Sequence, residues 1–303
     1  MSDNLLSYRF VSPNKKLFPQ IISVNCKLSI GKATAVGRGD SWSSQISKEK
    51  AFGEGIERFS LNDNLPIFSA LKCPNTSNGI AFQYTIDKAQ ANSFNEIIER
   101  ESVINAWSQD HPVHAFDESD LGQFTRDNKN FRKVLEIAVR DHGLSFHLLY
   151  FGQFKNIHTV GVCFQSTFHP YTTFGYSSNE SLAFAFEKAF IECCIIYERY
   201  KMYSNKIINL QEKNKSLENI LYYAENKKTL KEIFPGLICK NDIIFFESKV
   251  SSSGFVKLIF DLKNIGLPGF IVRTLNRHFF DFSAGGIKSS YGSRKLGEVH
   301  PIG

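Results

Sequence analysis

The sequence predicts an α+β fold with a mixed or antiparallel sheet and three acidic helices. Three observations support this prediction. The chain has 303 residues and is 42% hydrophobic, which is enough to bury a substantial core. Short segments that alternate polar and apolar residues, as strands do, are interspersed with longer segments of helical period. No linker rich in Gly, Ser or Pro divides the chain, so we expect one domain over residues 1–303.

The first half of the chain predicts strands followed by two acidic helices. Residues 20–36 alternate as short strands, and 37–39, Gly-Arg-Gly, predict a turn before the first acidic helix. A second turn signal, Asn-Thr-Ser-Asn-Gly at 75–79, precedes a helix expected over 87–107.

The second half predicts a helix, a hairpin, a third acidic helix and a group of strands. Gly143 ends a helix expected over 130–141, and a short polar loop joins two strand-like segments into a hairpin. Lysines and glutamates alternate among leucines over 205–234, which predicts helical segments at the surface. The expected strands are 144–151, 157–164, 243–247, 255–261 and 269–274.

The acidic helices share a repeated sequence. The pattern F-x-E-x-I-E-R-x-S occurs at 52–60 and again, forty-two positions later, at 94–102. At about 100° of rotation per residue, the Phe and Ile of each copy share one helix face and the two Glu lie together on the opposite face. A degenerate third copy retains Phe190 and Glu192 but has Ile195 in place of the second Glu. The carboxylates of the two full copies are Glu54, Glu57, Glu96 and Glu99.

Four carboxylates on two helices repel one another, and divalent cations that prefer oxygen ligands relieve that repulsion. Arg58 and Arg100 follow the second Glu of each copy and suit phosphate oxygens beyond such a metal. The alternative is an ordinary salt-bridge ladder on an exposed helix, because Lys50, Glu54 and Arg58 are spaced by four.

Composition excludes several other classes. A net charge of +6 from dispersed lysines suits a phosphate-bearing or acidic ligand and does not indicate nucleic acid. The six cysteines form no C-x-x-C pair, which argues against a disulfide framework or a zinc site. The sequence has no signal peptide and no apolar stretch of 18 residues, so we expect a cytoplasmic protein without membrane contact. Glycine-rich phosphate-binding motifs are also missing.

Taken together, these segments resemble the YcaO family of ATP-dependent enzymes that modify peptide backbones. The resemblance rests on 37–39 with 51–58, on 77–79 with 95–102 and Trp107, and on 175–177 with 181–192. The tail at 285–303 is similar to the proline-bearing C-terminus of azoline-forming members, particularly the ATP-using subunit of azole-forming microcin synthetases. Two positions depart from the family pattern. Ile195 stands where Gln is common, and Pro301 is the only proline of the tail.

The resemblance implies a cyclodehydratase that uses ATP and Mg²⁺ in a cleft lined by the three acidic helices. A Cys, Ser or Thr side chain of a ribosomal precursor peptide attacks the preceding carbonyl, ATP phosphorylates the amide oxygen, and loss of phosphate leaves an azoline. Phosphorylation makes sense because an amide oxygen is a poor leaving group. On the resemblance, Arg58 and Arg100 orient phosphates, and the tail brings Pro301 and the Gly303 carboxylate to the reacting amide. The implied metal ligands are Glu54, Glu57, Glu96, Glu99 and Glu192.

Family resemblance also implies partners. The core fold begins within about the first twenty residues, so we expect the leader peptide to be bound by a separate partner subunit. A flavin-dependent azoline dehydrogenase is a further candidate partner, and a homodimer or a hetero-oligomeric synthetase is the expected assembly. Two alternatives stay open: a YcaO enzyme that forms thioamides or amidines, and a catalytically silent peptide-binding scaffold.

Overall fold

The structure, a computed structural model, describes residues 6–13, 17–30, 32–61, 78–108, 111–116, 128–166, 172–203, 228–239, 247–248, 250, 253–276, 282–283 and 286–287. Contacts divide the chain into two compact units. Unit 1 comprises residues 1–97 and 252–280, and unit 2 comprises 98–251 and 281–303. No helix among the described residues is long and apolar enough to cross a membrane.

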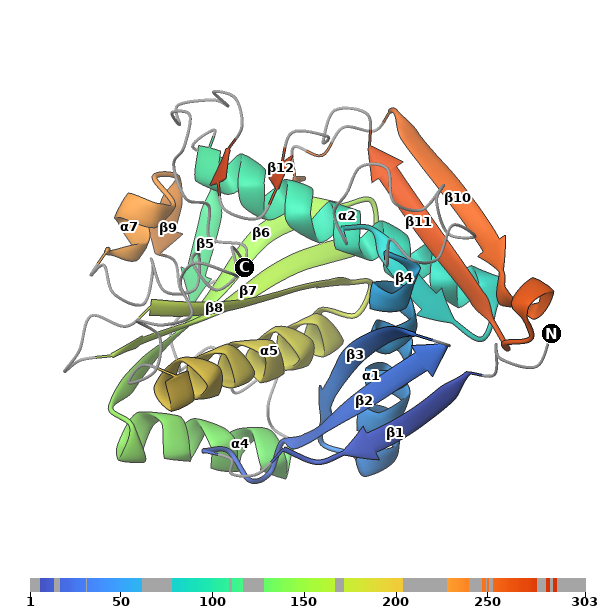
Figure 1. The fold of residues 1–303 in the computed structure, drawn as a ribbon. Helices are drawn as coiled ribbons and strands as arrows, with labels where there is room; N and C mark the ends of the chain where they lie inside the picture. Colours follow the sequence, from blue (N-terminus) through green and yellow to red (C-terminus); the bar gives the residue numbers. More distant parts are fainter. Residues whose placement is uncertain are drawn as a thin grey trace. The chain divides into compact units, whose positions relative to one another are not determined.

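The described elements are helices and mostly antiparallel strands (Figure 1). The helices are α1 (Ser44–Ser60), α2 (Ile86–Ser108), α4 (Lys129–Glu136), the π-helix η3 (Ile137–Asp141), α5 (Leu182–Tyr203), α7 (Leu230–Ile233) and the 3₁₀ helix η5 (Leu262–Ile265). The strands are β1 (Ser7–Val11), β2 (Ile22–Ile30), β3 (Ala33–Ser41), β4 (Ile80–Gln83), β5 (Val113–Phe116), β6 (Leu144–Phe154), β7 (Ile157–Ser166), β8 (Thr172–Asn179), β9 (Leu237–Cys239), β10 (Phe255–Asp261), β11 (Phe270–Asn276), β12 (Phe282–Ser283) and β13 (Gly286–Ile287).

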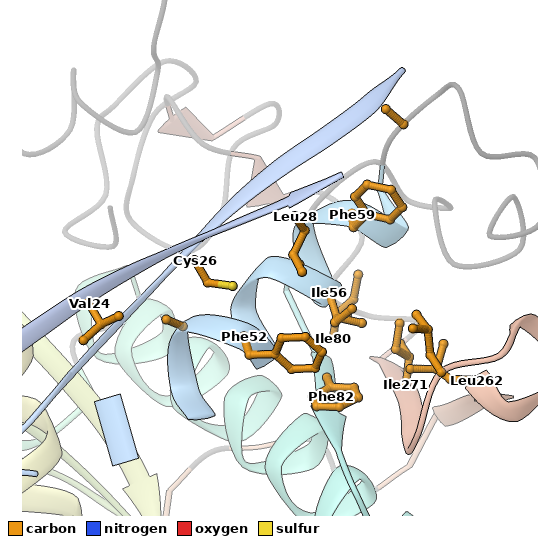
Figure 2. Close-up of a cluster of buried hydrophobic side chains, with 13 residues drawn as sticks. Val24, Cys26, Leu28, Phe52, Ile56, Phe59, Ile80, Phe82, Leu262 and Ile271 are labelled. Atoms are coloured by element: carbon orange, nitrogen blue, oxygen red, sulfur yellow. The ribbon is translucent and has the colours of Figure 1, made fainter. Parts of the chain in front are cut away.

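Unit 1 contains two antiparallel three-stranded sheets. Sheet A has the order β1-β2-β3, and sheet B has the order β10-β11-β4, so β4 joins a hairpin from the far end of the sequence. Helix α1 supplies a hydrophobic face to the core of this unit. Figure 2 shows Phe52 and Ile56 of α1 beside Ile80 and Phe82 of β4, with Leu28 of β2 in the same cluster. The predicted apolar face of the first acidic helix is therefore its buried face.

Unit 2 is built on sheet C, a five-stranded sheet of order β8-β7-β6-β5-β9 in which only β5 and β9 are parallel. Helix α5 packs on one face, where the Thr173 hydroxyl lies 3.6 Å from the Cys193 sulfur. The second half of α2 packs on the other face, where the Thr159 hydroxyl donates to Ser102 at 3.3 Å. The side chains of successive residues in a strand point to opposite faces, so sheet C can contact α5 on one face and α2 on the other.

The α+β class is confirmed, and several predicted elements occur where the sequence placed them. The helix expected over 87–107 is α2, the helix expected over 130–141 is α4 with η3, and the predicted hairpin is β6-β7. The strand expected over 255–261 is β10. The strand expected over 243–247 lies almost wholly outside the described residues, as does most of the segment 205–234.

The turn predicted at 37–39 is wrong. Gly37, Arg38 and Gly39 lie inside β3, paired with β2. Gly37 and Gly39 are required here because α1 packs directly on the strand: a Cβ on Gly39 would lie 1.9 Å from the Ser47 carbonyl oxygen. A pair of glycines in a strand therefore marks close approach of another backbone rather than a change of direction.

Helix α4 begins at a side-chain cap that can be tested. The Asn128 side chain accepts a hydrogen bond from the Phe131 backbone N–H at 3.1 Å. We expect Asn128→Ala to lower the free energy of unfolding by about 1 kcal/mol, measured by urea denaturation. The control is Lys129→Ala, an exposed first residue of the same helix, which we expect to be close to neutral.

Candidate functional site

The three acidic helices follow their strands with the same local spacing. A Cβ on Gly37 of β3 would lie 2.1 Å from the Ala51 carbonyl oxygen of α1, and a Cβ on Gly175 of β8 would lie 2.2 Å from the Ala189 carbonyl oxygen of α5. In both cases the helix residue follows the glycine by fourteen positions. Gly79, just before β4, repeats the spacing of fourteen through a different contact, because its carbonyl accepts a hydrogen bond from the Ser93 hydroxyl of α2. The β3–α1 and β8–α5 pairs therefore share one register.

This register brings a glutamate of the helix to a backbone N–H of the strand. In unit 1, the Arg38 N–H donates to Glu54 Oε2 at 2.6 Å. In unit 2, the Tyr176 N–H donates to Glu192 Oε2 at 2.9 Å, across the same sequence separation of sixteen residues. β3 and β8 are edge strands of their sheets. Each carboxylate therefore accepts a hydrogen bond from a backbone N–H that has no acceptor on a neighbouring strand of that sheet.

Glu57 forms a third bond of this kind. Its Oε1 accepts the Phe82 N–H of β4 at 2.8 Å, and β4 ends sheet B. Glu96 and Glu99 both lie on α2, three residues apart and hence on one side of that helix, with Glu96 partly buried and Glu99 only 5% exposed. Glu54, Glu57 and Glu192 are therefore oriented by the backbone, as a ligand carboxylate needs to be.

Arg58 forms one of the two ion pairs of the salt-bridge ladder that was the alternative interpretation of the first acidic helix. Arg58 Nη2 lies 2.5 Å from Glu54 Oε1, and Arg58 Nη1 donates to the Val36 carbonyl at 2.8 Å. Lys50, the other end of the predicted ladder, donates to the Asp40 carbonyl at 3.2 Å. Because the Arg58 side chain is 51% exposed, its pair with Glu54 is worth little stability and can exchange for another anion.

In unit 2 the structure brings two carboxylates and an arginine together. Arg100 Nη1 lies 3.6 Å from Glu99 Oε1. Burial raises the pKa of Glu192, and the charge of Glu99 raises it further. Arg100, the Tyr176 N–H and Lys188 lower it again without cancelling the rise. A buried acid, Glu99, and a partly buried one, Glu192, that disfavour each other's charge form a place where a cation is stabilising.

Within the described ranges, no three His, Cys, Asp or Glu side chains gather as a complete metal site. Mg²⁺ does not need such a cage, because it keeps several waters and takes one or two carboxylates together with substrate phosphates. The Glu99–Glu192 pair fits that pattern. Ser177, the residue after the Tyr176 N–H that binds Glu192, has a fully buried hydroxyl with no hydrogen-bond partner in the described part of the chain.

The raised pKa of Glu192 predicts a pH dependence of stability. As pH rises above about 4.5, the unfolded chain loses this proton before the folded chain does, so folding loses stability until the folded pKa is passed. We expect Glu192→Gln to remove this loss. The melting temperature of the variant should exceed that of the wild type at neutral pH, with a gain that shrinks toward pH 4.5. An equal difference at every pH would contradict the assignment.

A separate cavity of about 270 Å³ lies in unit 2 between α4, the start of α5 and sheet C. Its walls are mostly aromatic and aliphatic, and the polar groups on its rim include Asn128 and Glu187. None of the predicted site residues lines it. The tail residues Pro301 and Gly303 lie outside the described residues, so their predicted role stays a prediction.

The sequence and the fold together place the chain in a class of ATP- and Mg²⁺-binding enzymes. It belongs to the YcaO cyclodehydratase family, described as ATP- and Mg²⁺-binding, which matches residues 68–275 and so includes parts of both units. A comparison with curated proteins gave no match. The predicted family, enzyme class and cofactors are thereby confirmed.

Solved structures show the same fold at low sequence identity. A chain of the E. coli microcin synthetase McbBCD complex with pro-MccB17 bound has a TM-score of 0.61 and 11% identity, covering 91% of this chain and 88% of that one. A heterocyclase in complex with substrate and cofactor has a TM-score of 0.64 and 12% identity, covering 95% of this chain and 51% of that one. YcaO from Methanopyrus kandleri, bound with AMPPCP and Mg²⁺, has a TM-score of 0.54 and 12% identity, covering 88% and 84%.

Proposed function

We propose that this YcaO enzyme converts Cys, Ser or Thr residues of a ribosomal precursor peptide to azolines. The observation that carries the proposal is the set of glutamates on the acidic helices, three of them fixed by backbone N–H groups and two of them coupled by charge. When bound, MgATP supplies the phosphoryl group that turns the amide oxygen of the peptide into a leaving group.

Residues of this chain would position the Mg²⁺ and the phosphate groups for that reaction. Glu54, Glu57, Glu96, Glu99 and Glu192 would hold Mg²⁺, and Arg58 and Arg100 would orient phosphate oxygens. The anchoring N–H groups keep the carboxylates in place before the ligand arrives, so little reorganisation is needed on binding. Exposed Arg58 can leave Glu54 for a phosphate, which fits a group that meets its ligand from solvent.

The experiment is phosphate release by the purified chain with a leader-bearing precursor peptide and a leader-binding partner. We expect turnover that requires the peptide, together with loss of water from the peptide in mass spectrometry. We also expect the partner to raise turnover by raising the effective concentration of the core peptide. Peptide binding without phosphate release would instead support a silent scaffold, and full activity without any partner would remove the need for a second subunit.

The C-terminal tail is the feature that distinguishes azoline formation from the second candidate function, thioamide or amidine formation. That second candidate is favoured by the tail's having a single proline, Pro301. We propose that Pro301 keeps the tail extended and that the Gly303 carboxylate accepts a proton near the reacting amide. Deleting 300–303 should leave ATP binding within about twofold, because no proposed metal ligand is removed, but it should stop ring formation. Cyclisation at the full-length rate would show that the tail has no catalytic part.

A further inference from the structure

Two exposed tyrosines of unit 1 are joined by a row of aromatic rings. Tyr8 of β1 is 58% exposed, and Tyr84, just after β4, is 54% exposed. The Tyr8 ring centre lies 5.4 Å from that of Phe52, which in turn lies 5.8 Å from that of Phe82. The Phe82 ring centre lies 5.3 Å from that of Tyr84. Phe52 and Phe82 belong to the core (Figure 2), so these four residues, the tyrosine patch, present exposed rings on a fixed base.

A carboxylate lies beside the tyrosine patch. Glu49 precedes Phe52 by three positions on α1, so the two side chains share one side of the helix. The Gln45 amide donates to Glu49 Oε1 at 2.7 Å and orients the carboxylate. Partial burial raises the pKa of Tyr84, and the charges of Glu49 and Tyr8 raise it further, which places both acidic groups near the Tyr84 hydroxyl. At neutral pH Glu49 therefore gives the patch a negative charge.

Two basic side chains that neighbour these residues in the sequence point elsewhere. Arg9 follows Tyr8 in β1 and so points to the other face of sheet A. Lys50 follows Glu49 in α1, and its Nζ donates to the Asp40 carbonyl of β3, at the opposite edge of sheet A from β1. The patch thus combines aromatic faces with a carboxylate, although the whole chain carries a net charge of +6.

Aromatic faces beside a carboxylate suit a cationic side chain, because the ring electrons and the negative charge both attract it. We propose that the tyrosine patch binds an arginine side chain of the precursor peptide, with the guanidinium stacked on Tyr8 and Tyr84 and paired with Glu49. Arginine fits better than lysine, because its planar group stacks on an aromatic ring and still donates to a carboxylate. The choice of the precursor peptide rests on the proposed function, whereas the arginine site does not.

The patch lies close to a proposed metal ligand of the same unit. Phe82 connects the two, since its ring belongs to the patch and its N–H donates to Glu57 Oε1 at 2.8 Å. Glu49 and Glu57 are eight residues apart on α1, which corresponds to about 12 Å along the helix axis. An extended peptide covers about 12 Å in about four residues. We therefore expect the arginine about four residues from the Cys, Ser or Thr that reacts.

The test is NMR of the full chain labelled with ¹³C in its tyrosine rings, without ATP or precursor peptide. The probes are N-acetyl-arginine amide and N-acetyl-citrulline amide, which has nearly the same shape but no charge. We expect saturable shifts of the Tyr8 and Tyr84 ring signals with the arginine probe, and half-saturation by the citrulline probe at a concentration at least about fivefold higher. The remaining tyrosines of the chain's eleven are internal controls.

Two carboxylate-to-amide variants separate a specific site from general charge. Glu49→Gln should reduce the preference for the arginine probe to less than about twofold. Glu136→Gln, at an exposed glutamate of α4, removes the same charge elsewhere and should leave the preference unchanged. Tyr84→Leu keeps an apolar side chain but lacks the ring, so it should weaken binding of the arginine probe about threefold to fivefold. Tyr84→Phe keeps the ring and should bind like the wild type.

Equal half-saturation by the two probes, or a preference for arginine that survives Glu49→Gln, would overturn the site. A series of leader-bearing precursor peptides tests the source of the arginine. Replacing each arginine by Gln, one at a time, should raise KM about fivefold for the one about four residues from the reacting residue and leave kcat unchanged.

If the probe binds but no arginine of the peptide affects KM, the assignment to the precursor peptide is wrong and the site takes an arginine of another protein. The NMR measurement needs no turnover, so its outcome is independent of the proposed chemistry. An inactive chain that still prefers the arginine probe would contradict the proposed function alone. An active chain without that preference would contradict the arginine site alone.

Discussion

Replacing Glu57 or Glu99 by Gln should abolish peptide-dependent ATP turnover while the protein stays folded. Glutamine keeps the shape of the side chain, and its amide oxygen can still accept the Phe82 N–H that Glu57 accepts now. The charge that a metal needs is lost in either variant. We expect phosphate release to fall at least about a hundredfold, since even changes around a metal's direct ligands cost tenfold to a hundredfold.

The matched control is Glu187→Gln on α5. Glu187 lies beside the separate cavity and accepts a hydrogen bond from Asn128 at 3.4 Å, so the same chemical change is made outside the proposed metal site. Its turnover should stay within about twofold of the wild type. Normal turnover in both Glu57→Gln and Glu99→Gln would remove these residues from the proposed metal site. Isothermal titration with Mg²⁺ and a non-hydrolysable ATP analogue would separate lost binding from lost chemistry.

Adding a single methyl group at Gly37 should destabilise unit 1 severely. The new Cβ would lie 2.1 Å from both the Ala51 carbonyl oxygen and the Gly55 nitrogen, and neither backbone can move without shifting α1 on sheet A. We expect Gly37→Ala to cost at least about 3 kcal/mol of unfolding free energy, measured by urea denaturation. Soluble expression should fall with it.

Gly53→Ala is the opposite case on the same helix. Its Cβ would come no closer than 3.3 Å, to the edge of the Phe82 ring, and alanine favours a helix interior by up to about 1 kcal/mol. We expect this variant to be neutral or slightly stabilised. Equal losses in Gly37→Ala and Gly53→Ala would show that close strand–helix packing is not the reason for Gly37.

The spacing of apolar residues predicted the helices, because a helix face such as that of Phe52 and Ile56 can be recognised in the sequence itself. Alternating segments joined by a short polar loop predicted the hairpin in the same way. The same period predicted that Glu54 and Glu57 lie away from the core. It could not reveal the anchors of these carboxylates. Arg38, Phe82 and Tyr176 have nothing in common as side chains, and what they contribute is a backbone N–H at the end of a sheet. Such partners become visible only once the strand order is known.

Sheet order was likewise beyond the sequence. The pairing of β4 with β11 joins segments from opposite ends of the chain, and no pattern in either strand names the other. Gly37 and Gly39 were misassigned to a turn because glycine serves both tight turns and close packing. One feature of the sequence could have separated a tight turn from close packing. Gly37 and Gly175 each precede an acidic helix and lie fourteen residues before the helix residue that they contact.

The common register of the β3–α1 and β8–α5 pairs also bears on how the chain folds. Each pair joins residues fourteen to sixteen positions apart, so its contacts close short loops and can form early without the rest of the chain. Sheet B requires β10 and β11, which follow most of the sequence, and must wait for a long-range search. We expect amide protection in pulse-labelled refolding to appear at Arg38 and Tyr176 before it appears at Ile271. The carboxylates proposed to hold the metal would then be oriented before the larger sheet around them is complete.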